Sequence, residues 1–139
     1  MNKNDLLYSA GFFDGEGCIT TSGNSGFRAC VSNTEKEILT YFLKTFGGHI
    51  NDQHLPSNPN HNMAWKWVIV RKSELLTFLK LVYPHLKLKK EQAGIVINFL
   101  TNYPNYGFGK RIPTQQKLKY NSTKEQLRKL KLDKHFNRS

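Results

Sequence analysis

Several features that would assign a small protein to a familiar class are scarce in this chain of 139 residues. It holds two cysteines, Cys18 and Cys30, with no C-x-x-C pair and no Cys/His grouping at zinc-site spacing. Two free thiols fit a reducing compartment, and a disulfide across a hairpin is the alternative. The sequence has no membrane-length apolar run and no signal or transit peptide. We therefore expect an intracellular protein, in a bacterial cytoplasm or an organelle, without a membrane or small-molecule cofactor.

Acidic residues are also scarce, because 10 Asp and Glu stand against 21 Lys and Arg, a formal net charge of +11. A compact domain with such an excess repels itself unless a polyanionic partner uses the charge, and nucleic acid is the first candidate. The alternative is a basic charge that only keeps the protein soluble. Hydrophobic residues make up 38% and aromatic residues 12%, so most of the chain is expected to fold around one core.

The spacing of apolar residues predicts an α+β domain with the order α-β-β-α-β-β-α-α. Asp5 is the expected N-cap of the first helix, and Thr34, with Glu37 three residues later, is expected to form a capping box on the second. The two hairpins are expected to form one four-stranded antiparallel sheet, with helices on its apolar face and the other face open. The expected elements are a helix over 5–15, two strands within 18–32, a helix over 34–46, strands over 49–54 and 63–71, and helices over 73–82 and 85–100.

The C-terminal quarter differs in composition from the rest of the chain. Residues 1–103 are expected to form a single domain, with 104–139 as a basic loop and helical arm of the same domain. The arm is rich in lysine and weakly helical. Its few apolar anchors are Leu118, Leu127, Leu130 and Leu132. In the sheet, Trp65 and Trp67 are assigned to the core rather than to base stacking.

The stretch "YSAGFFDGEG" places two acids and three glycines where the first helix ends. Gly11 and Gly15 lie four residues apart on one helix face, which permits very close contact with a second helix. Glu16 follows at the C-terminal end of the helix. If two such helices pair, two Glu16 carboxylates come together, which is costly unless a metal neutralises them. Paired acids with a divalent metal on a basic, open sheet are suited to phosphodiester hydrolysis. The alternative is an acidic turn that only ends a helix.

This stretch resembles the nine-residue motif of the LAGLIDADG homing endonucleases. Four positions are identical to the motif, two phenylalanines remain hydrophobic, and three positions depart from it. The likeness extends from about residue 6 to residue 100. The identical residues are Ala10, Gly11, Asp14 and Gly17; the hydrophobic ones are Phe12 and Phe13; the departures are Ser9 for Leu, Gly15 for Ala and Glu16 for Asp.

The resemblance implies a homing-endonuclease-like α-β-β-α-β-β-α fold with a saddle-shaped sheet. It also implies a site-specific endonuclease that makes a double-strand break in DNA by Mg²⁺-dependent hydrolysis, in the service of intron or intein homing. Family enzymes use two motif helices, so this chain with one motif is expected to form a homodimer through its first helix and to bind a long, near-palindromic double-stranded DNA site. The expected interface residues are Ala10, Gly11, Asp14 and Gly15.

Roles for individual site residues also come from the resemblance. Glu16 is the expected metal-binding acid, with the Gly15 carbonyl nearby, and Asp14 is mainly structural. Asn33 is expected to position water at the scissile phosphate. Lys89 is expected to stabilise charge there, with Lys87 as the alternative.

The open face of the sheet is expected to read DNA, because a two-stranded ribbon fits the major groove and Arg, Asn and Gln pair with base edges. The alternative for each residue is an ordinary solvated strand face. Lysines of the loops and arm are expected to contact phosphates. The expected DNA-binding residues are Thr20, Ser22, Asn24, Arg28, Cys30, Ser32, His49, Asn51, Gln53 and Lys66.

Two other classes of function compete with the nuclease. One is a binding module on the same fold, either an RNA-binding intron maturase or a DNA-binding protein that does not cleave. The presence of Glu16 and Lys89 favours the nuclease, because degenerate members lose the acid. The other is an HNH-type nuclease, suggested by the pair at 61–62, which lacks a further histidine at a workable spacing.

Overall fold

The computed structural model describes residues 1–23, 25–54, 64–103 and 112–136, with the backbone alone at 52–54 and 133–136. Asn24, the pair at 61–62 and most of both long polar loops therefore lie outside the described residues. The elements are α1 (Lys3–Glu16), β1 (Gly17–Ser22), β2 (Gly26–Asn33), α2 (Lys36–Phe46), β3 (His49–His54), β4 (Ala64–Ile69), α3 (Lys72–Val82), the 3₁₀ turn η1 (Tyr83–His85), α4 (Lys90–Asn102) and α5 (Thr114–Phe136).

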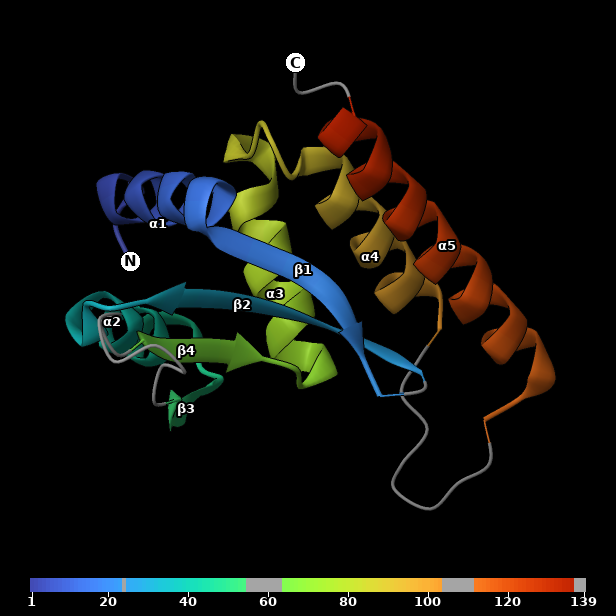
Figure 1. Ribbon diagram of the computed structural model, residues 1–139, viewed down its shortest axis with the longest axis horizontal. Coiled ribbons are helices and arrows are strands. Elements are labelled where there is room, and N and C mark those ends of the chain that lie inside the picture. Colours follow the sequence, from blue (N-terminus) through green and yellow to red (C-terminus); the bar gives the residue numbers. More distant parts are fainter. Residues whose placement is uncertain (24, 55–63, 104–111, 137–139) are drawn as a thin grey trace.

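The predicted α+β class and four-stranded antiparallel sheet are confirmed. The strand order is β1-β2-β4-β3, so each hairpin pairs internally and β2 joins them through β4. Figure 1 shows α1 leading directly into β1, α3 behind the sheet, and α5 running alongside α4. None of the helices in the described part of the chain has the length and apolarity needed to span a bilayer.

The core lies between the helices and one face of the sheet. Alternate strand residues point into it, since successive side chains of a strand face opposite ways. Trp67 is fully buried at its centre, and its Nε1 donates a hydrogen bond to the Gly47 carbonyl at 2.8 Å. Trp65 is only half-buried, with the Lys36 ammonium 5.9 Å from its ring centroid. The other inward sheet residues are Ile19, Phe27, Ala29, Val31 and Ile69.

Both predicted helix caps are wrong. Helix α1 begins two residues earlier than expected, and the Oδ1 of Asn2, not Asp5, accepts the cap hydrogen bond, from the Asp5 N–H at 2.8 Å. Helix α2 follows Glu35, which makes no side-chain cap bond, so the expected capping box of Thr34 does not form. The Asn33 Oδ1 instead accepts the Glu35 N–H at 2.8 Å. In both places an asparagine amide beside the helix competes successfully for the same kind of backbone donor.

The helix predicted over 85–100 begins later than the sequence suggested. Tyr83–His85 forms a 3₁₀ turn, and α4 starts at Lys90. The backbone N–H groups in between bind a side chain of α1, described below, instead of joining the helix. The sequence does not reveal this competing partner, because it lies more than seventy residues away.

Helix α5 adds two buried apolar side chains to the core. Two of its four expected anchors are exposed, Leu118 at 64% and Leu132 at 40%. The helix is held by the expected anchor Leu127 and by Tyr120, which was not expected; both are buried, and the Tyr120 hydroxyl donates to the Gly26 carbonyl at 2.9 Å. Because tyrosine supplies a large apolar ring and a donor at once, it ties α5 to the start of β2.

Candidate active site and nucleic-acid interface

The C-terminal end of α1 presents Glu16 to solvent. Glu16 is the last residue of the helix, and Gly17 begins β1 at once. A Cβ at Gly17 would lie 2.3 Å from the Phe13 Cδ1 and 2.6 Å from the Phe13 carbonyl oxygen. Only glycine fits this abrupt passage from helix to strand, so the motif glycine fixes where the exposed carboxylate of Glu16 stands.

Asp14 connects this helix end to the loop before α4. Its Oδ2 accepts the backbone N–H groups of Lys87 and Leu88, both at 3.0 Å, and its Oδ1 accepts that of Lys89 at 2.9 Å. The residue is only 8% exposed. Burial alone would raise the pKa of this carboxyl, but the three hydrogen bonds and the nearby Lys89 charge hold it below its usual value. The charged form of Asp14 is thus the one that the fold stabilises.

Lys89 is bound to the same residue a second time. Its Nζ donates to the Asp14 backbone carbonyl at 2.6 Å, a position where the negative end of the helix dipole favours a cation. Asp14 lies two residues before Glu16 on α1, so its hydrogen bonds hold Lys89 at the helix end that carries Glu16. The structure brings these two predicted site residues to one helix end. Lys87 is exposed beside them, with its backbone N–H on Asp14.

Asn33 lies at the same end of the sheet. Gly17 pairs with Val31 across β1 and β2, and Asn33 is the last residue of β2, two positions further on. Its Oδ1 is engaged by the Glu35 N–H in the turn into α2. The contact observed for this side chain is thus a structural one, and its expected role toward water stays a prediction.

The strand register places most of the expected DNA-binding residues on one face. Thr20 lies opposite Arg28 across β1 and β2, and the next residues of this face, Cys18 and Cys30, pair in the same way. The rows continue through β4 into β3. They read Cys18–Cys30–Val68–His49 and Ser32–Lys66–Asn51, with Ser22 at the end of β1.

Exposure differs along this face. Ser32 and His49 are exposed, whereas Cys30 is only 4% exposed and does not present its thiol for direct contact with a base edge. Val68, which sequence reasoning did not assign to this face, is buried in the same row. The alternation along β4 was the available signal for Val68. Gln53 lies in β3 within the segment between Asn51 and His54 where the register with β4 shifts.

The charges of three lysines from separate elements act on Cys18: Lys66 of β4, Lys89 before α4 and Lys131 of α5. The pKa of the Cys18 thiol is lowered, first because the Cys30 thiol donates a hydrogen bond to its sulfur and then because of these charges, although burial opposes the shift. The pKa of Cys30 is raised, because it gives that hydrogen bond. Sequence reasoning missed Lys131, whose Nζ donates to the Ile19 carbonyl.

The candidate ligands for a divalent cation at the α1 end are oxygen atoms. The Glu16 carboxylate and the Gly15 carbonyl are hard ligands of the kind that Mg²⁺ prefers. Within the described parts of the chain, no group of three or more His, Cys, Asp or Glu residues could hold a metal ion. One carboxylate per chain fits a site completed by other groups, such as phosphate oxygens or a second Glu16.

The expected dimer residues divide into two sets. Ala10 is fully buried and Asp14 nearly so, both inside their own chain, so they are not available to a second helix. Gly11 and Gly15 are exposed, and a Cβ at either would meet no atom within 4 Å. Of the four expected interface residues, only Gly11 and Gly15 are therefore accessible to a second helix.

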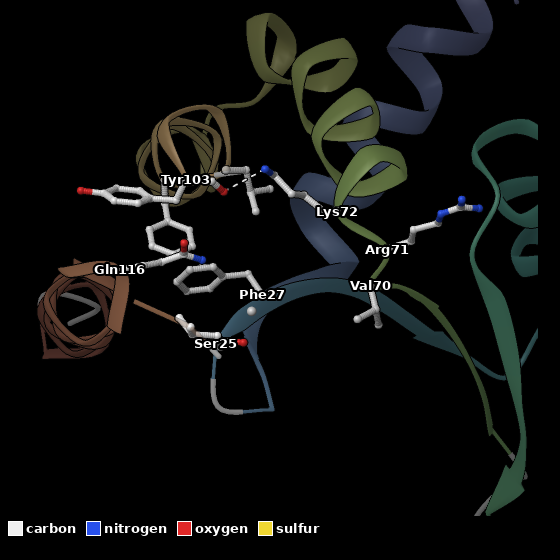
Figure 2. Close-up of a pocket in the computed structure, with 11 residues that line it drawn as sticks. Ser25, Phe27, Val70, Arg71, Lys72, Tyr103 and Gln116 are labelled. Atoms are coloured by element: carbon white, nitrogen blue, oxygen red, sulfur yellow. Dashed lines mark hydrogen bonds between the residues drawn. The ribbon is translucent and has the colours of Figure 1, made fainter. Parts of the chain in front are cut away.

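A cavity of about 240 Å³ lies apart from these residues, between the sheet and α5 (Figure 2). Phe27, Tyr103 and Gln116 line it, and the Lys72 Nζ donates to the Tyr103 carbonyl at 2.8 Å. The Oε1 of Gln116 is buried there without a partner among the described residues. None of the predicted site residues lines this cavity, and its lining contains no acid.

Comparison with known structures gives matches over nearly the whole chain. A crystal structure of the homing endonuclease I-CvuI in complex with an I-CreI target, in the presence of Mg and with the DNA not cleaved, has a TM-score of 0.61. It is 22% identical and covers 92% of this chain and 95% of that chain. The archaeal intron-encoded homing endonuclease I-Vdi141I complexed with DNA has a TM-score of 0.53, is 17% identical and covers 93% and 98%.

Comparison with curated protein sequences gives no match. The structural likeness establishes a homing-endonuclease fold, with helices and a four-stranded antiparallel sheet. The model of the LAGLIDADG-like domain matches residues 4–83, more than half of the chain, and includes the motif helix except its first residue and the whole sheet. This protein therefore belongs to the LAGLIDADG family.

Proposed function

We propose that this protein is a site-specific DNA endonuclease that hydrolyses phosphodiesters with a divalent metal, acting as a homodimer. The observation that carries the proposal is the α1 end, where Asp14 holds Lys89 beside the exposed Glu16 at one edge of an open, basic sheet face. An acid for the metal and a cation for the phosphate are thus kept together by the hydrogen bonds of the buried Asp14. Such preorganisation is what electrostatic stabilisation of a transition state needs.

The open face supplies the means to bind duplex DNA. Arg28, Asn51 and Lys66 come from three different strands and share this face with the hydroxyls of Thr20 and Ser32. These side chains can pair with base edges in the major groove, while lysines outside the sheet can contact phosphates. With a formal charge of +11 per chain, binding should weaken steeply as salt is raised.

Glu16, with the Gly15 carbonyl, would hold the divalent ion. The ion would neutralise charge on the phosphate and favour a bound water as hydroxide at neutral pH. Lys89 is placed to stabilise the negative charge that develops on the scissile phosphate. Asn33, at the nearby end of β2, would orient the attacking water.

The exposed face of α1 supports pairing of two chains. Leu7, Gly11 and Gly15 are spaced four residues apart, so they lie on one face of the helix. Leu7 is 41% exposed, and the adjacent Tyr8 is 56% exposed, so this part of the helix offers apolar surface that a second helix could bury. A second α1 packed here would cover these residues and bring two Glu16 side chains close together. A symmetric dimer would then cut both strands of a near-palindromic site.

The decisive experiment compares the wild-type chain with Glu16→Gln. A target is first selected by binding of the wild type to randomised duplex DNA, and cleavage is then followed with and without Mg²⁺. We expect the wild type to cut both strands only with the metal, and the variant to bind with unchanged affinity without cutting. If neither protein cuts a tightly bound duplex, the chain is a DNA-binding protein on this fold. If neither selects a duplex but both bind structured intron RNA, the maturase alternative holds.

A further inference from the structure

The two cysteines face each other across the first hairpin. Cys18 of β1 and Cys30 of β2 are direct partners in the antiparallel register. Directly opposite residues in such a pair have Cα atoms about 4.5 or 5.5 Å apart. Both values lie within the range of about 4.4 to 6.8 Å that a disulfide spans. The backbone therefore already holds the two residues at a separation that a disulfide can bridge.

The side chains point toward one another as well. Both side chains lie on the same face of the hairpin, and the Cys30 thiol donates a hydrogen bond to the Cys18 sulfur. The chain has no third cysteine to compete for either of them. Cys18 is half-buried and reachable by a small molecule, whereas Cys30 is almost fully covered. Cys30 is thus shielded from other proteins but can reach Cys18.

We propose that Cys18 and Cys30 are an oxidation site, which closes to an intramolecular disulfide when the protein meets a hydroperoxide. The Cys18 sulfur attacks one peroxide oxygen, the O–O bond breaks, and water leaves with the thiol proton, which gives a sulfenic acid on Cys18. The Cys30 sulfur then attacks the Cys18 sulfur, the S–O bond breaks, and a second water leaves. Two thiols are oxidised by two electrons in total, and one hydrogen peroxide is reduced to two waters.

The position of the pair connects this chemistry to nucleic-acid binding. Cys18 is two residues from Glu16, and the Cys18–Cys30 row lies between the Thr20–Arg28 row and the row that contains Ser32. A duplex on the open face would cover Cys18 and slow its oxidation. This second consequence rests on the proposed function, whereas formation of the disulfide does not.

The test uses the full chain, reduced and then treated with hydrogen peroxide. We expect intact mass to fall by two hydrogen atoms per chain, both thiols to become unreactive toward maleimide, and a reducing phosphine to reverse both changes. Cys30→Ser is the matched control, in which a sulfenic acid on Cys18 should accumulate and react with dimedone. A second variant is Cys18→Ser, and circular dichroism of both variants verifies that they fold. The proposal would be wrong if both thiols of the treated wild type stayed reactive toward maleimide. It would also be wrong if they were oxidised only to separate sulfenic acids, without a disulfide.

Bound DNA provides the second arm. With the selected duplex in excess, we expect the disulfide to form several-fold more slowly than in the free protein. If the disulfide forms equally fast with and without a duplex that is shown to be bound, Cys18 is not on the DNA-facing surface. If no duplex binds but the disulfide still forms, the oxidation site stands and the proposed function fails.

Discussion

Replacing Asp14 tests the network that joins the motif helix to the loop before α4. Asp14→Ala removes the acceptor of three backbone N–H groups, at 2.9 to 3.0 Å, while the groups themselves remain. A lost hydrogen bond to a partly buried donor costs about 1 kcal/mol when water replaces it in part. Lys87 and Leu88 are exposed, so water can replace these hydrogen bonds in part. The three lost bonds together should lower the free energy of unfolding by about 3 kcal/mol. Asp14→Asn keeps one oxygen acceptor and should cost about 1–2 kcal/mol.

The pH dependence gives this prediction a sign. In the folded chain the pKa of Asp14 lies below its ordinary value of 3.8. As pH falls, the unfolded chain binds a proton on this carboxyl before the folded chain does, so folding loses stability. The contribution is complete above about pH 5 and disappears as pH falls through 3.8 and then through the lower folded pKa. The stability gap between wild type and Asp14→Asn should therefore narrow from pH 7 to pH 3.

Urea unfolding, followed by far-UV circular dichroism and by fluorescence of the buried Trp67, measures these differences at both pH values. An Asp14→Ala variant within about 0.5 kcal/mol of the wild type would refute the reasoning, since that is the scatter of ordinary surface substitutions. If the stability difference between wild type and Asp14→Asn stayed constant from pH 7 to pH 3, the folded chain would not stabilise the charged form of Asp14. Cleavage by a fully folded Asp14→Asn at the wild-type rate would show that this residue does not position Lys89.

Four further substitutions test other parts of the argument. Gly17→Ala should cost about 1–3 kcal/mol in urea unfolding, because its Cβ would meet Phe13, whereas Gly15→Ala, with open space around it, should be neutral or stabilising. Tyr120→Phe should cost about 1 kcal/mol through the lost bond to the Gly26 carbonyl, and an unchanged stability would mean that α5 is not tied to β2. Gly11→Val should leave the monomer folded but lower the mass measured by sedimentation velocity, and a dimer of unchanged affinity would exclude pairing through this face of α1.

The sequence predicted well those features that depend on local periodicity. Alternation along the strands placed Arg28 and Lys66 on the same face, and the structure gives them that face through the β2–β4 register. Helix boundaries were predicted less accurately, because propensity alone does not decide between neighbouring cap residues. At α1 the cap bond is accepted by Asn2 and not by the predicted Asp5. The anchors of α5 were misjudged for a related reason. Only leucines were taken as the apolar anchors of the arm, whereas Tyr120 is as buried as Leu127 and also makes a hydrogen bond.

What the sequence could not show is which distant groups meet. Lys89 was expected near the site only through the family resemblance, and nothing in its neighbourhood announces that a carboxylate on α1 binds its backbone. Lys131 was missed altogether, because its place beside Cys18 depends on how α5 packs along α4. Both cases are long-range contacts, which local patterns of apolar residues do not encode.

The two acids of the motif end have opposite environments, and this explains why a chain with few carboxylates has two of them only two positions apart at one helix end. Asp14 is buried and satisfied by backbone donors, so it fixes a loop and carries Lys89 with it. Glu16 is exposed at the last helical position, one residue before a glycine at which any larger residue would crowd Phe13. A structural carboxylate and a reactive one cannot exchange these roles, since the first needs donors that face inward and the second needs access to a ligand. Swapping Asp14 and Glu16 should therefore destroy stability and cleavage together, although composition and charge stay the same.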